Sequence, residues 1–261
     1  MGILNVTPDS FSDGGRFTRT NTAVEHAFKM IGDGAHIIDI GGESTRPGSV
    51  PVSEDEECKR ILPVIKSIKK LNSKITISVD TYKASVAKKA IEAGADMVND
   101  ISGLTFDPNM LSLLSGKDIP VIIMHINGKP KTMQKNPVYD NLVKDIKNFL
   151  SQQSKVAEEN GIKNNHIILD PGIGFGKTFD HNFTLINRLD EICSLGYPVM
   201  IGPSRKAFIG DVLDLPPEDR IEGTLATIVA GIMNGAKIVR VHDVKEVNRV
   251  VKITEKIIAS E

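Results

Sequence analysis

Short runs of β-branched and apolar residues recur along the chain, and a segment with helical spacing separates each run from the next. The runs are continuous and do not alternate regularly between apolar and polar residues, which is typical of parallel strands covered on both faces. We expect eight strands, at residues 2–6, 36–40, 75–79, 96–98, 121–124, 167–169, 199–201 and 237–241.

The segments between these runs place apolar residues three and four positions apart, as on one face of an amphipathic helix. Two examples are Ile61, Leu62, Ile65 with Ile68, and Ile221, Leu225, Ile228 with Ile232. Gly34, Gly94 and Gly235 each follow such a segment and precede a strand. A glycine there can take the left-handed conformation that ends a helix.

About eight alternations of strand and helix, without a linker or a charge block, predict a single (β/α)8 barrel. We expect one domain over residues 1–261. A doubly wound open sheet is the competing architecture. The first strand begins almost at the first residue, so either the bottom of the barrel is uncapped or a leading segment lies outside this numbering.

Composition narrows the functional classes. The chain has 261 residues, of which 40% are hydrophobic, and 32 basic and 33 acidic residues give a net charge of -1. This balance argues against binding to nucleic acid or a membrane surface through bulk charge. A membrane-spanning run and a signal peptide are both lacking, so we expect a cytoplasmic protein. Cys58 and Cys193 form no CxxC pair, and we expect both thiols to be reduced.

Polar residues stand at or just past the ends of the expected strands. They are Asn5, Asp39, Asp80, Asn99, His125, Asp170, Ser204, Lys206, Arg240 and His242. In a parallel barrel, strand ends of one sense open on one face, so these scattered residues are expected to share one site.

Asp80, Asn99 and Asp170 can donate and accept hydrogen bonds along the edge of a flat, nitrogen-rich heterocycle. A guanidine-like edge pairs bidentately with a carboxylate. Alternatively, Asp80 or Asp170 caps the helix that follows it, since aspartate is a common capping residue. Asp39 is a weaker candidate, because a glycine pair follows closely and a buried structural role fits equally well.

Lys206, Arg240 and His242 form a cationic group, to which Arg46 could be added from a loop. In a chain of nearly neutral charge, a polyphosphate ligand requires such a local cluster. Mg²⁺ often accompanies bound phosphates and prefers oxygen ligands. Asn5 could supply one such oxygen.

Three loops complete the pattern. Segments 7–17 and 41–52 are long and polar, follow strands, and are candidate lids. The glycine-rich segment 170–178 resembles a phosphate loop. However, a Walker motif would need glycine in place of Pro171, and a dinucleotide motif would need glycine in place of Lys177. Its glycines are expected to allow a sharp turn instead.

Taken together, these motifs resemble the dihydropteroate synthase family. The resemblance runs in order over essentially the whole chain, through MGILNVTPDSFSDGG, GGESTRPGS, SVDT, NDISG, DPGIGFGKT, SRKAFIG and RVHDV. It implies condensation of 6-hydroxymethyl-7,8-dihydropterin diphosphate with 4-aminobenzoate, giving 7,8-dihydropteroate and diphosphate. It also implies a barrel that uses Mg²⁺ and forms a homodimer.

The resemblance assigns roles to matching residues. The residues expected to hold the pterin are Asp80, Asn99, Asp170 and Lys206. Those expected to contact the diphosphate are Thr45, Arg240 and His242, with Asn5 as a ligand of Mg²⁺. Those expected from the loops around the aminobenzoate are Phe11, Arg46 and Pro47. Lys206, Arg240 and His242 are the residues expected to be catalytic.

Two other functions share the barrel. A corrinoid-type methyltransferase would use similar pterin ligands, but it has no diphosphate to expel and little use for the cationic group. A catalytically silent binding barrel could lose ligands freely, whereas every expected ligand is present here.

Overall fold

The computed structural model describes residues 1–7 and 16–260, with 16–19 described as backbone only. It contains the eight expected strands, and most of their boundaries lie within one or two residues of the prediction. They are β1 (Gly2–Asn5), β2 (Ile37–Gly41), β3 (Thr76–Asp80), β4 (Met97–Asp100), β5 (Val121–Met124), β6 (Ile167–Asp170), β7 (Met200–Ile201) and β8 (Ile238–Val239).

The strands follow one another around a ring. β1 to β6 form one parallel sheet in chain order, and β7 pairs in parallel with β8. Single parallel bridges join the two sheets, Leu169 to Val199 on one side and Gly2 to Val241 on the other. The last strand therefore meets the first, which confirms the barrel and excludes the open sheet.

The final strand is shorter than predicted. Residues 237–241 were expected to be a strand, but only Ile238–Val239 has regular pairing. Arg240 donates to the Ile201 carbonyl, and Val241 donates to Met1 on the opposite side. The chain thus passes from one neighbouring strand to the other within two residues, through single bonds in place of a ladder. Arg240 and His242 consequently lie just beyond the strand.

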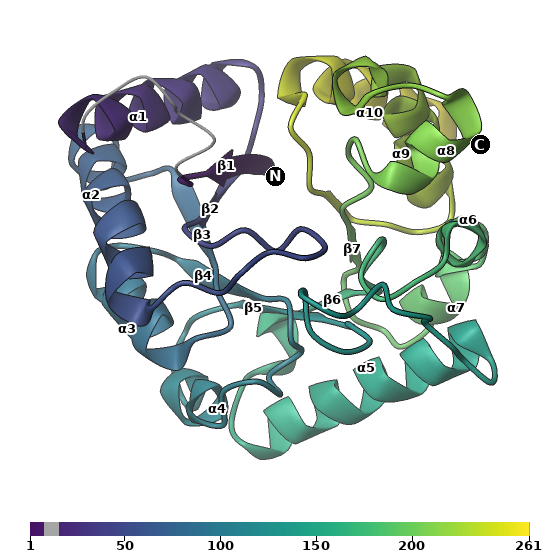
Figure 1. The fold of residues 1–261 in the computed structure, drawn as a ribbon, viewed down its shortest axis with the longest axis horizontal. Coiled ribbons are helices and arrows are strands. Elements are labelled where there is room, and N and C mark those ends of the chain that lie inside the picture. Colours follow the sequence, from purple (N-terminus) through teal and green to yellow (C-terminus); the bar gives the residue numbers. More distant parts are fainter. Residues whose placement is uncertain (8–15, 261) are drawn as a thin grey trace.

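Helices enclose the strands (Figure 1). They are α1 (Arg16–Gly32), α2 (Glu54–Leu71), α3 (Ala84–Glu92), α4 (Asn109–Leu114), α5 (Leu142–Glu159), α6 (Phe179–Asn187), α7 (Leu189–Cys193), α8 (Ala207–Leu213), α9 (Ile221–Met233) and α10 (Val244–Ile258). As predicted, Gly34, Gly94 and Gly235 have positive φ, at 104°, 112° and 104°. Among the described residues, none of these helices combines the length and apolarity needed to cross a membrane.

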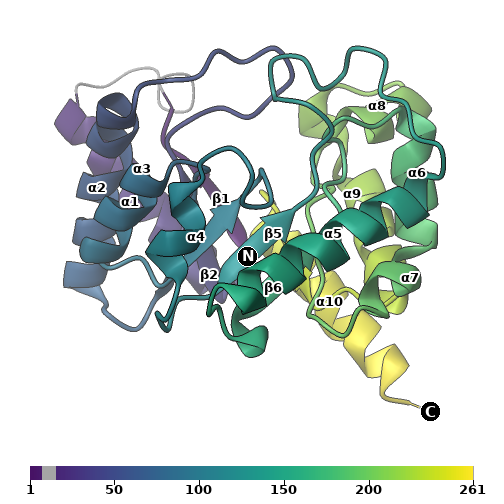
Figure 2. The same cartoon turned by 90° about the horizontal axis from the view of Figure 1, so that it is seen from below.

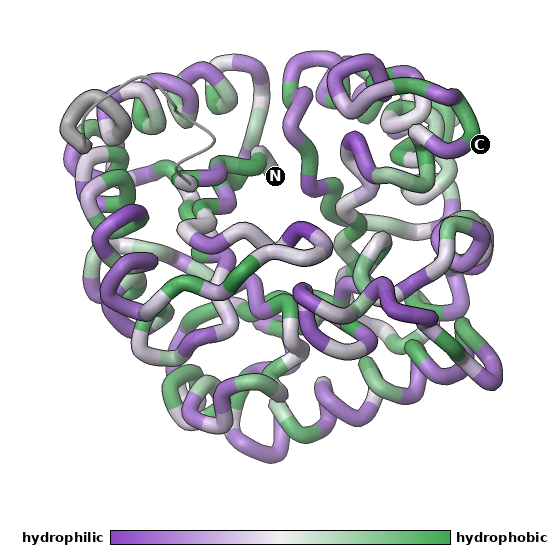
Figure 3. Tube along the Cα trace, in the orientation of Figure 1, coloured by the Kyte–Doolittle hydropathy of each residue, from purple (hydrophilic) through white to green (hydrophobic). Residues whose placement is uncertain are grey.

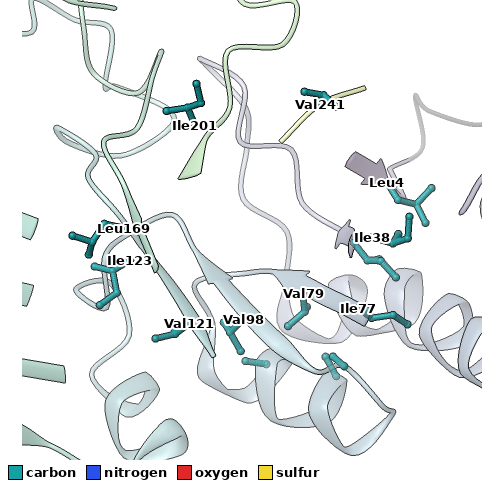
Figure 4. Close-up of a cluster of buried hydrophobic side chains, with 14 of the residues drawn as sticks. Leu4, Ile38, Ile77, Val79, Val98, Val121, Ile123, Leu169, Ile201 and Val241 are labelled. Carbon is teal, nitrogen blue, oxygen red and sulfur yellow. The ribbon is translucent and has the colours of Figure 1, made fainter. Parts of the chain in front are cut away.

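The main core lies between the strands and the helices. Hydrophilic and hydrophobic residues alternate along most of the helices (Figure 3), as in amphipathic helices with one apolar face. Strand side chains that point outward pack against the helices in this core, and Figure 4 labels ten of the core residues that it draws. Because alternate strand residues point to opposite faces, the remaining strand side chains fill the barrel interior.

That interior changes character along its length. Near the amino ends of the strands, Met97, Ile122 and Met200 form a small apolar cluster with Ile168 and Ile238 packed against it. Toward the carboxyl ends, the inward side chains become polar, as in Ser78 and Asp80 of β3. The long connections that follow β2 and β5 rise at one end of the molecule (Figure 2). The polar end of the interior therefore opens toward these loops.

Candidate active site

Residues at the ends of the first four strands lie in one row across the barrel. Asn5 is paired in register with Gly41, Gly41 with Asp80, and Asp80 with Asn99. The structure thus brings together three predicted site residues that are far apart in sequence. Glycine in the row leaves room between its neighbours: a Cβ built on Gly41 would lie 3.6 Å from Asp80 Oδ2 and 3.8 Å from Asn5 Oδ1.

Arg240 reaches into this row and joins two carboxylates. Its Nε lies 2.6 Å from Asp39 Oδ2, and its Nη2 lies 2.6 Å from Asp80 Oδ2. Asn99 Nδ2 donates to the same Asp39 oxygen at 3.1 Å. Asp39 is fully buried, and Asp80 and Asn99 are 8% and 2% exposed. We call Asp39, Asp80, Asn99 and Arg240 the ionic layer.

Burial dominates the electrostatics of this layer. It raises the pKa of Asp80 to about 7, against the opposing pull of Arg240 and with the help of the Asp39 charge. Burial alone would lower the pKa of Arg240, but Asp39 and Asp80 raise it above its ordinary value. The guanidinium is therefore permanently charged and lies beside a carboxyl whose pKa is raised by burial.

Polar atoms remain unpaired beside the ion pairs. Asp39 Oδ1, Asn99 Oδ1 and Ser78 Oγ are buried and have no hydrogen-bond partner among the described residues. Buried polar atoms are normally satisfied, so unpaired ones at the open end of a barrel indicate a site for a polar ligand.

Asp170 ends β6 and is also buried, at 4% exposed. Its Oδ1 accepts a hydrogen bond from the Gly172 amide at 2.7 Å, and burial raises its pKa. The helix-cap alternative for the two aspartates is wrong, because the residues that precede α3 and α6 are Lys83 and Thr178. The predicted turn is confirmed: Gly172, Gly174 and Gly176 have φ values of 70°, 83° and 64°.

Lys206 extends into the interior opposite this loop. Its ammonium contacts the Ile173 carbonyl and lies 4.5 Å from the centroid of the Phe175 ring. Burial lowers the pKa of Lys206 to about 7, although the Asp170 charge opposes the shift. A cation over an aromatic ring beside a carboxylate can hold one face and one edge of a flat ligand.

His242 is placed by Ser204. The hydroxyl of Ser204 lies 3.0 Å from His242 Nδ1 and accepts the His242 backbone N–H at 3.2 Å. Burial lowers the pKa of His242 to about 4, and the nearby charges of Arg240, Arg205 and Arg46 contribute in the same direction. The imidazole is therefore neutral at physiological pH and can still donate one hydrogen bond.

The loop residues stand apart from the ionic layer. Thr45 is half-buried, and Arg46 and Pro47 are exposed on the segment between β2 and α2. Arg46 and Pro47 line a shallow hollow of about 400 Å³, together with Thr7 and Arg60. Phe11 lies outside the described residues.

Sequence reasoning undervalued Asp39 and missed Lys177. Lys177 is only 2% exposed, and its Nζ lies 3.1 Å from His125 Nδ1 and donates to the Phe175 carbonyl at 3.0 Å. Burial lowers the pKa of Lys177 well below its usual value. This amine therefore anchors the loop that presents Phe175 to Lys206. Asp39 could have been found from the alternation of side chains along β2. It lies two residues before the inward-facing Gly41 and therefore points to the same face.

Comparisons with known proteins bear on this arrangement. Residues 1–242 match the sequence model of a family described as pterin binding enzyme. A curated dihydropteroate synthase from Bacillus subtilis is 53% identical over 255 residues, which cover 98% of this chain and 87% of that protein. The chain belongs to the dihydropteroate synthase family. Its activity is that of a transferase of folate biosynthesis.

Solved structures agree in fold with this dihydropteroate synthase family member. A dihydropteroate synthase from Clostridium difficile, determined in the presence of pteroic acid, is 48% identical with a TM-score of 0.93, covering 98% of this chain and 95% of that chain. One from Xanthomonas albilineans with 4-aminobenzoic acid is 39% identical, also with a TM-score of 0.93, covering 100% and 93%.

Proposed function

We propose that Asp80, Asn99, Asp170 and Lys206 bind the pterin ring of 6-hydroxymethyl-7,8-dihydropterin diphosphate and that the same site transfers the pterin methylene to 4-aminobenzoate. In this reaction the carbon–oxygen bond to diphosphate breaks, and a bond from carbon to the aniline nitrogen forms. The nitrogen loses one proton, and diphosphate leaves. The observation that carries the proposal is Arg240 lying between Asp39 and Asp80 at the open end of the barrel.

The pterin would lie across Asp80, Asn99 and Asp170. Its amino and ring N–H groups would meet the carboxylates and the unpaired Asn99 Oδ1. Lys206 would supply a donor from the opposite side, next to the Phe175 ring. The negative charge of the two aspartates also stabilises a cation that develops at the methylene carbon.

The diphosphate would lie beyond the pterin, toward Thr45, Arg240 and His242. Arg240 uses Nε and Nη2 for carboxylates, and we assign Nη1 to a diphosphate oxygen. His242 is neutral and would donate from Nε2, because Ser204 holds Nδ1. The aniline is a weak base and needs no strong catalytic base, so stabilising the departing diphosphate is the main task.

Mg²⁺ fits the oxygen atoms present at the end of β1. Asn5 Oδ1 and Asp80 Oδ2 would both lie within 4 Å of a Cβ built on Gly41, and Asp80 Oδ2 also pairs with Arg240. Few protein oxygens gather there, as expected for an ion that shares its coordination with water and substrate phosphates. We propose that Asn5 holds Mg²⁺, which when bound neutralises charge on the diphosphate.

The loops would complete the site around the aminobenzoate. We propose that Arg46 and Pro47, together with Phe11, enclose this substrate and keep water away from the methylene carbon. Exclusion of water matters because water would compete with the aniline for a developing cation. The substitution is expected to be dissociative, without a covalent enzyme intermediate.

Diphosphate release tests the proposal directly. The protein is incubated with the pterin diphosphate, Mg²⁺ and 4-aminobenzoate, and diphosphate is measured over time. Release that depends on 4-aminobenzoate, with dihydropteroate formed in equal amount, is expected. Release without aminobenzoate dependence, or none from folded protein, contradicts it. A methyltransferase would leave the diphosphate intact.

We also propose that residues 1–261 act as one domain, in a cytoplasmic homodimer. Val212, Met233, Ile253 and Ile257 expose apolar surface on the adjacent helices α8, α9 and α10 (Figure 1). Such surface favours association with a second copy. Both cysteines are free thiols, as is usual in a reducing compartment. Sedimentation analysis should give twice the mass of one chain, and charged substitutions at Ile253 and Ile257 should reduce it.

A further inference from the structure

A second ionic cluster lies outside the ionic layer, at the base of the loop that carries Thr45, Arg46 and Pro47. The Lys83 ammonium lies 2.6 Å from Glu43 Oε2 and 2.7 Å from Glu57 Oε2. It also donates to the Val52 carbonyl at 2.8 Å. The side chains of Lys83, Glu43 and Glu57 are 13%, 6% and 1% exposed.

This cluster holds both ends of the loop. Glu43 stands at the start, and its Oε2 also accepts from the Val52 amide at 2.9 Å. Val52 stands at the other end, so residues 43 and 52 are joined directly and through the same ammonium. Arg60 adds a bond to the Gly42 carbonyl at 2.8 Å, and Tyr82 donates to Glu43 Oε1 at 2.7 Å.

The middle of the loop has fewer bonds to the other described residues. Within that part of the chain, its backbone–backbone bonds are a turn from Ser49 to Arg46 and a long contact, 3.3 Å, from the Gly48 amide to the Pro130 carbonyl. Beneath it lies a cavity of about 170 Å³, lined in part by Glu43, Tyr82 and Phe106. The loop thus has fixed ends and a middle with room to move.

Lys83 connects this loop to the ionic layer through the backbone. It lies three residues after Asp80, at the start of α3, where its side chain makes no capping bond. Its ammonium instead binds Glu43, Glu57 and the Val52 carbonyl. Because only two residues separate Lys83 from Asp80 at the end of β3, the position of the loop ends is fixed relative to Asp80.

The charges explain why the cluster is rigid. Burial raises the pKa of Glu57, which lies beside a second carboxylate, and the Lys83 ammonium opposes that shift. Without Lys83, two buried carboxylates would be left without a counterion, which is strongly unfavourable. Charge-assisted bonds of this kind hold their partners within a narrow range of positions.

We propose that Glu43, Lys83 and Glu57 form a clamp that positions the loop, so that Arg46 and Thr45 meet their substrates in the correct place relative to Asp80. The inference rests on the proposed function of Arg46 and Thr45. The three clamp residues touch neither substrate, so they are positioning residues. Misplacing a binding group by about 1 Å can cost on the order of 100-fold in rate.

Lys83→Met tests the clamp, with Lys83→Arg as the conservative variant. The expected result for Lys83→Met is a rise of about tenfold in KM for 4-aminobenzoate, while the affinity for a pterin without diphosphate changes less than about twofold. Lys83→Arg should restore most of the parent KM for 4-aminobenzoate. The control is Lys88→Met, an exposed lysine on the same helix, which should leave both quantities unchanged.

A double-mutant cycle with Arg46→Ala separates positioning from general destabilisation. If the clamp acts through the loop, Lys83→Met has little further effect on KM when Arg46 is already removed. Additive effects overturn the clamp. An unchanged KM in Arg46→Ala alone overturns the proposed role of Arg46, which is a failure of the proposed function and not of the clamp.

Glu43→Gln keeps the test decisive if Lys83→Met does not fold. This variant retains the Lys83–Glu57 pair and the shape of the side chain, so the buried charge stays compensated. We expect a rise of about threefold in KM for 4-aminobenzoate, with unchanged pterin affinity. The clamp would be contradicted if KM for 4-aminobenzoate rose and pterin affinity fell by similar factors, or if neither quantity changed.

Discussion

The two ends of the barrel interior are built from the same strands but have opposite effects on the stability of the fold. At the amino ends, Met97, Ile122 and Met200 form a buried apolar cluster. At the carboxyl ends, Asp39 and Asp80 are buried beside the Arg240 guanidinium. Burial of the first set stabilises the fold directly. Burial of the second set costs desolvation, which the ion pairs offset only in part.

Strand β3 contains this difference within five residues. Its inward positions run from Thr76 through Ser78 to Asp80, so polarity rises toward the open end. The outward residues Ile77 and Val79 are fully buried and apolar. The buried apolar residues thus stabilise the fold away from the ligands. Selection can then act on the charged residues for their chemistry. Substitutions at the two ends should therefore separate activity from stability.

The largest effect is expected at the charged end, from Arg240→Met. Turnover should fall about a thousandfold, because a charge that stabilises the leaving group is lost. The free energy of unfolding should also fall by about 3 kcal/mol, because Asp39 stays buried without its counterion. Diphosphate release and urea unfolding measure the two quantities. A loss of turnover below tenfold would show that Arg240 does not meet the diphosphate.

The converse variant at the apolar end is Ile122→Ala. Ile122 is fully buried, and its removal should lower the free energy of unfolding by about 3 kcal/mol. The turnover of the folded fraction should stay within about twofold of the parent, because Ile122, although paired in register with Asn99, offers no polar group to the substrates. Urea titration gives the first value and activity per folded molecule the second. A large loss of turnover would mean that the two ends are coupled.

The change of stability with pH should arise from residues at the charged end of the barrel. The pKa of His242 is about 4 in the folded chain and ordinarily about 6.5, so the unfolded chain binds more protons between these values. Stability therefore falls as pH drops from 6.5 to 4, and His242→Gln should remove about 1–3 kcal/mol of that change. Urea unfolding at pH 4.5 and 7 measures it. Exposed His36→Gln is the control, and an equal change there would refute the assignment.

The smallest effect is expected from Asn5→Ala, which sharpens the comparison at the edge of the charged end. The Mg²⁺ concentration for half-maximal activity should rise about tenfold, because one oxygen ligand is lost while water and phosphate oxygens remain. Thermal unfolding should hardly change. Titration of activity with Mg²⁺ provides the measurement. An unchanged requirement would place the ion elsewhere.

The apolar end and the overall fold were predictable because they depend on local pattern. Continuous apolar runs gave the strands, and the glycines after the helices gave the turns. The barrel followed from their number and order. The exception was β8, where the predicted strand was too long because the chain changes partner at Arg240 and Val241.

The charged end was predictable as a set of residues but not as a set of contacts. Arg240 pairs with Asp39 and Asp80 across 201 and 160 residues, and no local pattern encodes that pairing. Lys177 and the clamp lysine Lys83 were missed for a different reason. Lysine is almost always exposed, so nothing in the sequence marks one that is buried.

The seam between β8 and β1 has a consequence for synthesis of the chain. During translation, Asp39 and Asp80 emerge from the ribosome long before Arg240 is added. Val241 is needed to form the parallel bridge to Gly2. A nascent chain with six strands would hold the two carboxylates without their counterion. The partial barrel should therefore stay open until the last strand arrives. Closure of the ring and completion of the ionic layer are then one late event, and any chain released before residue 240 lacks both.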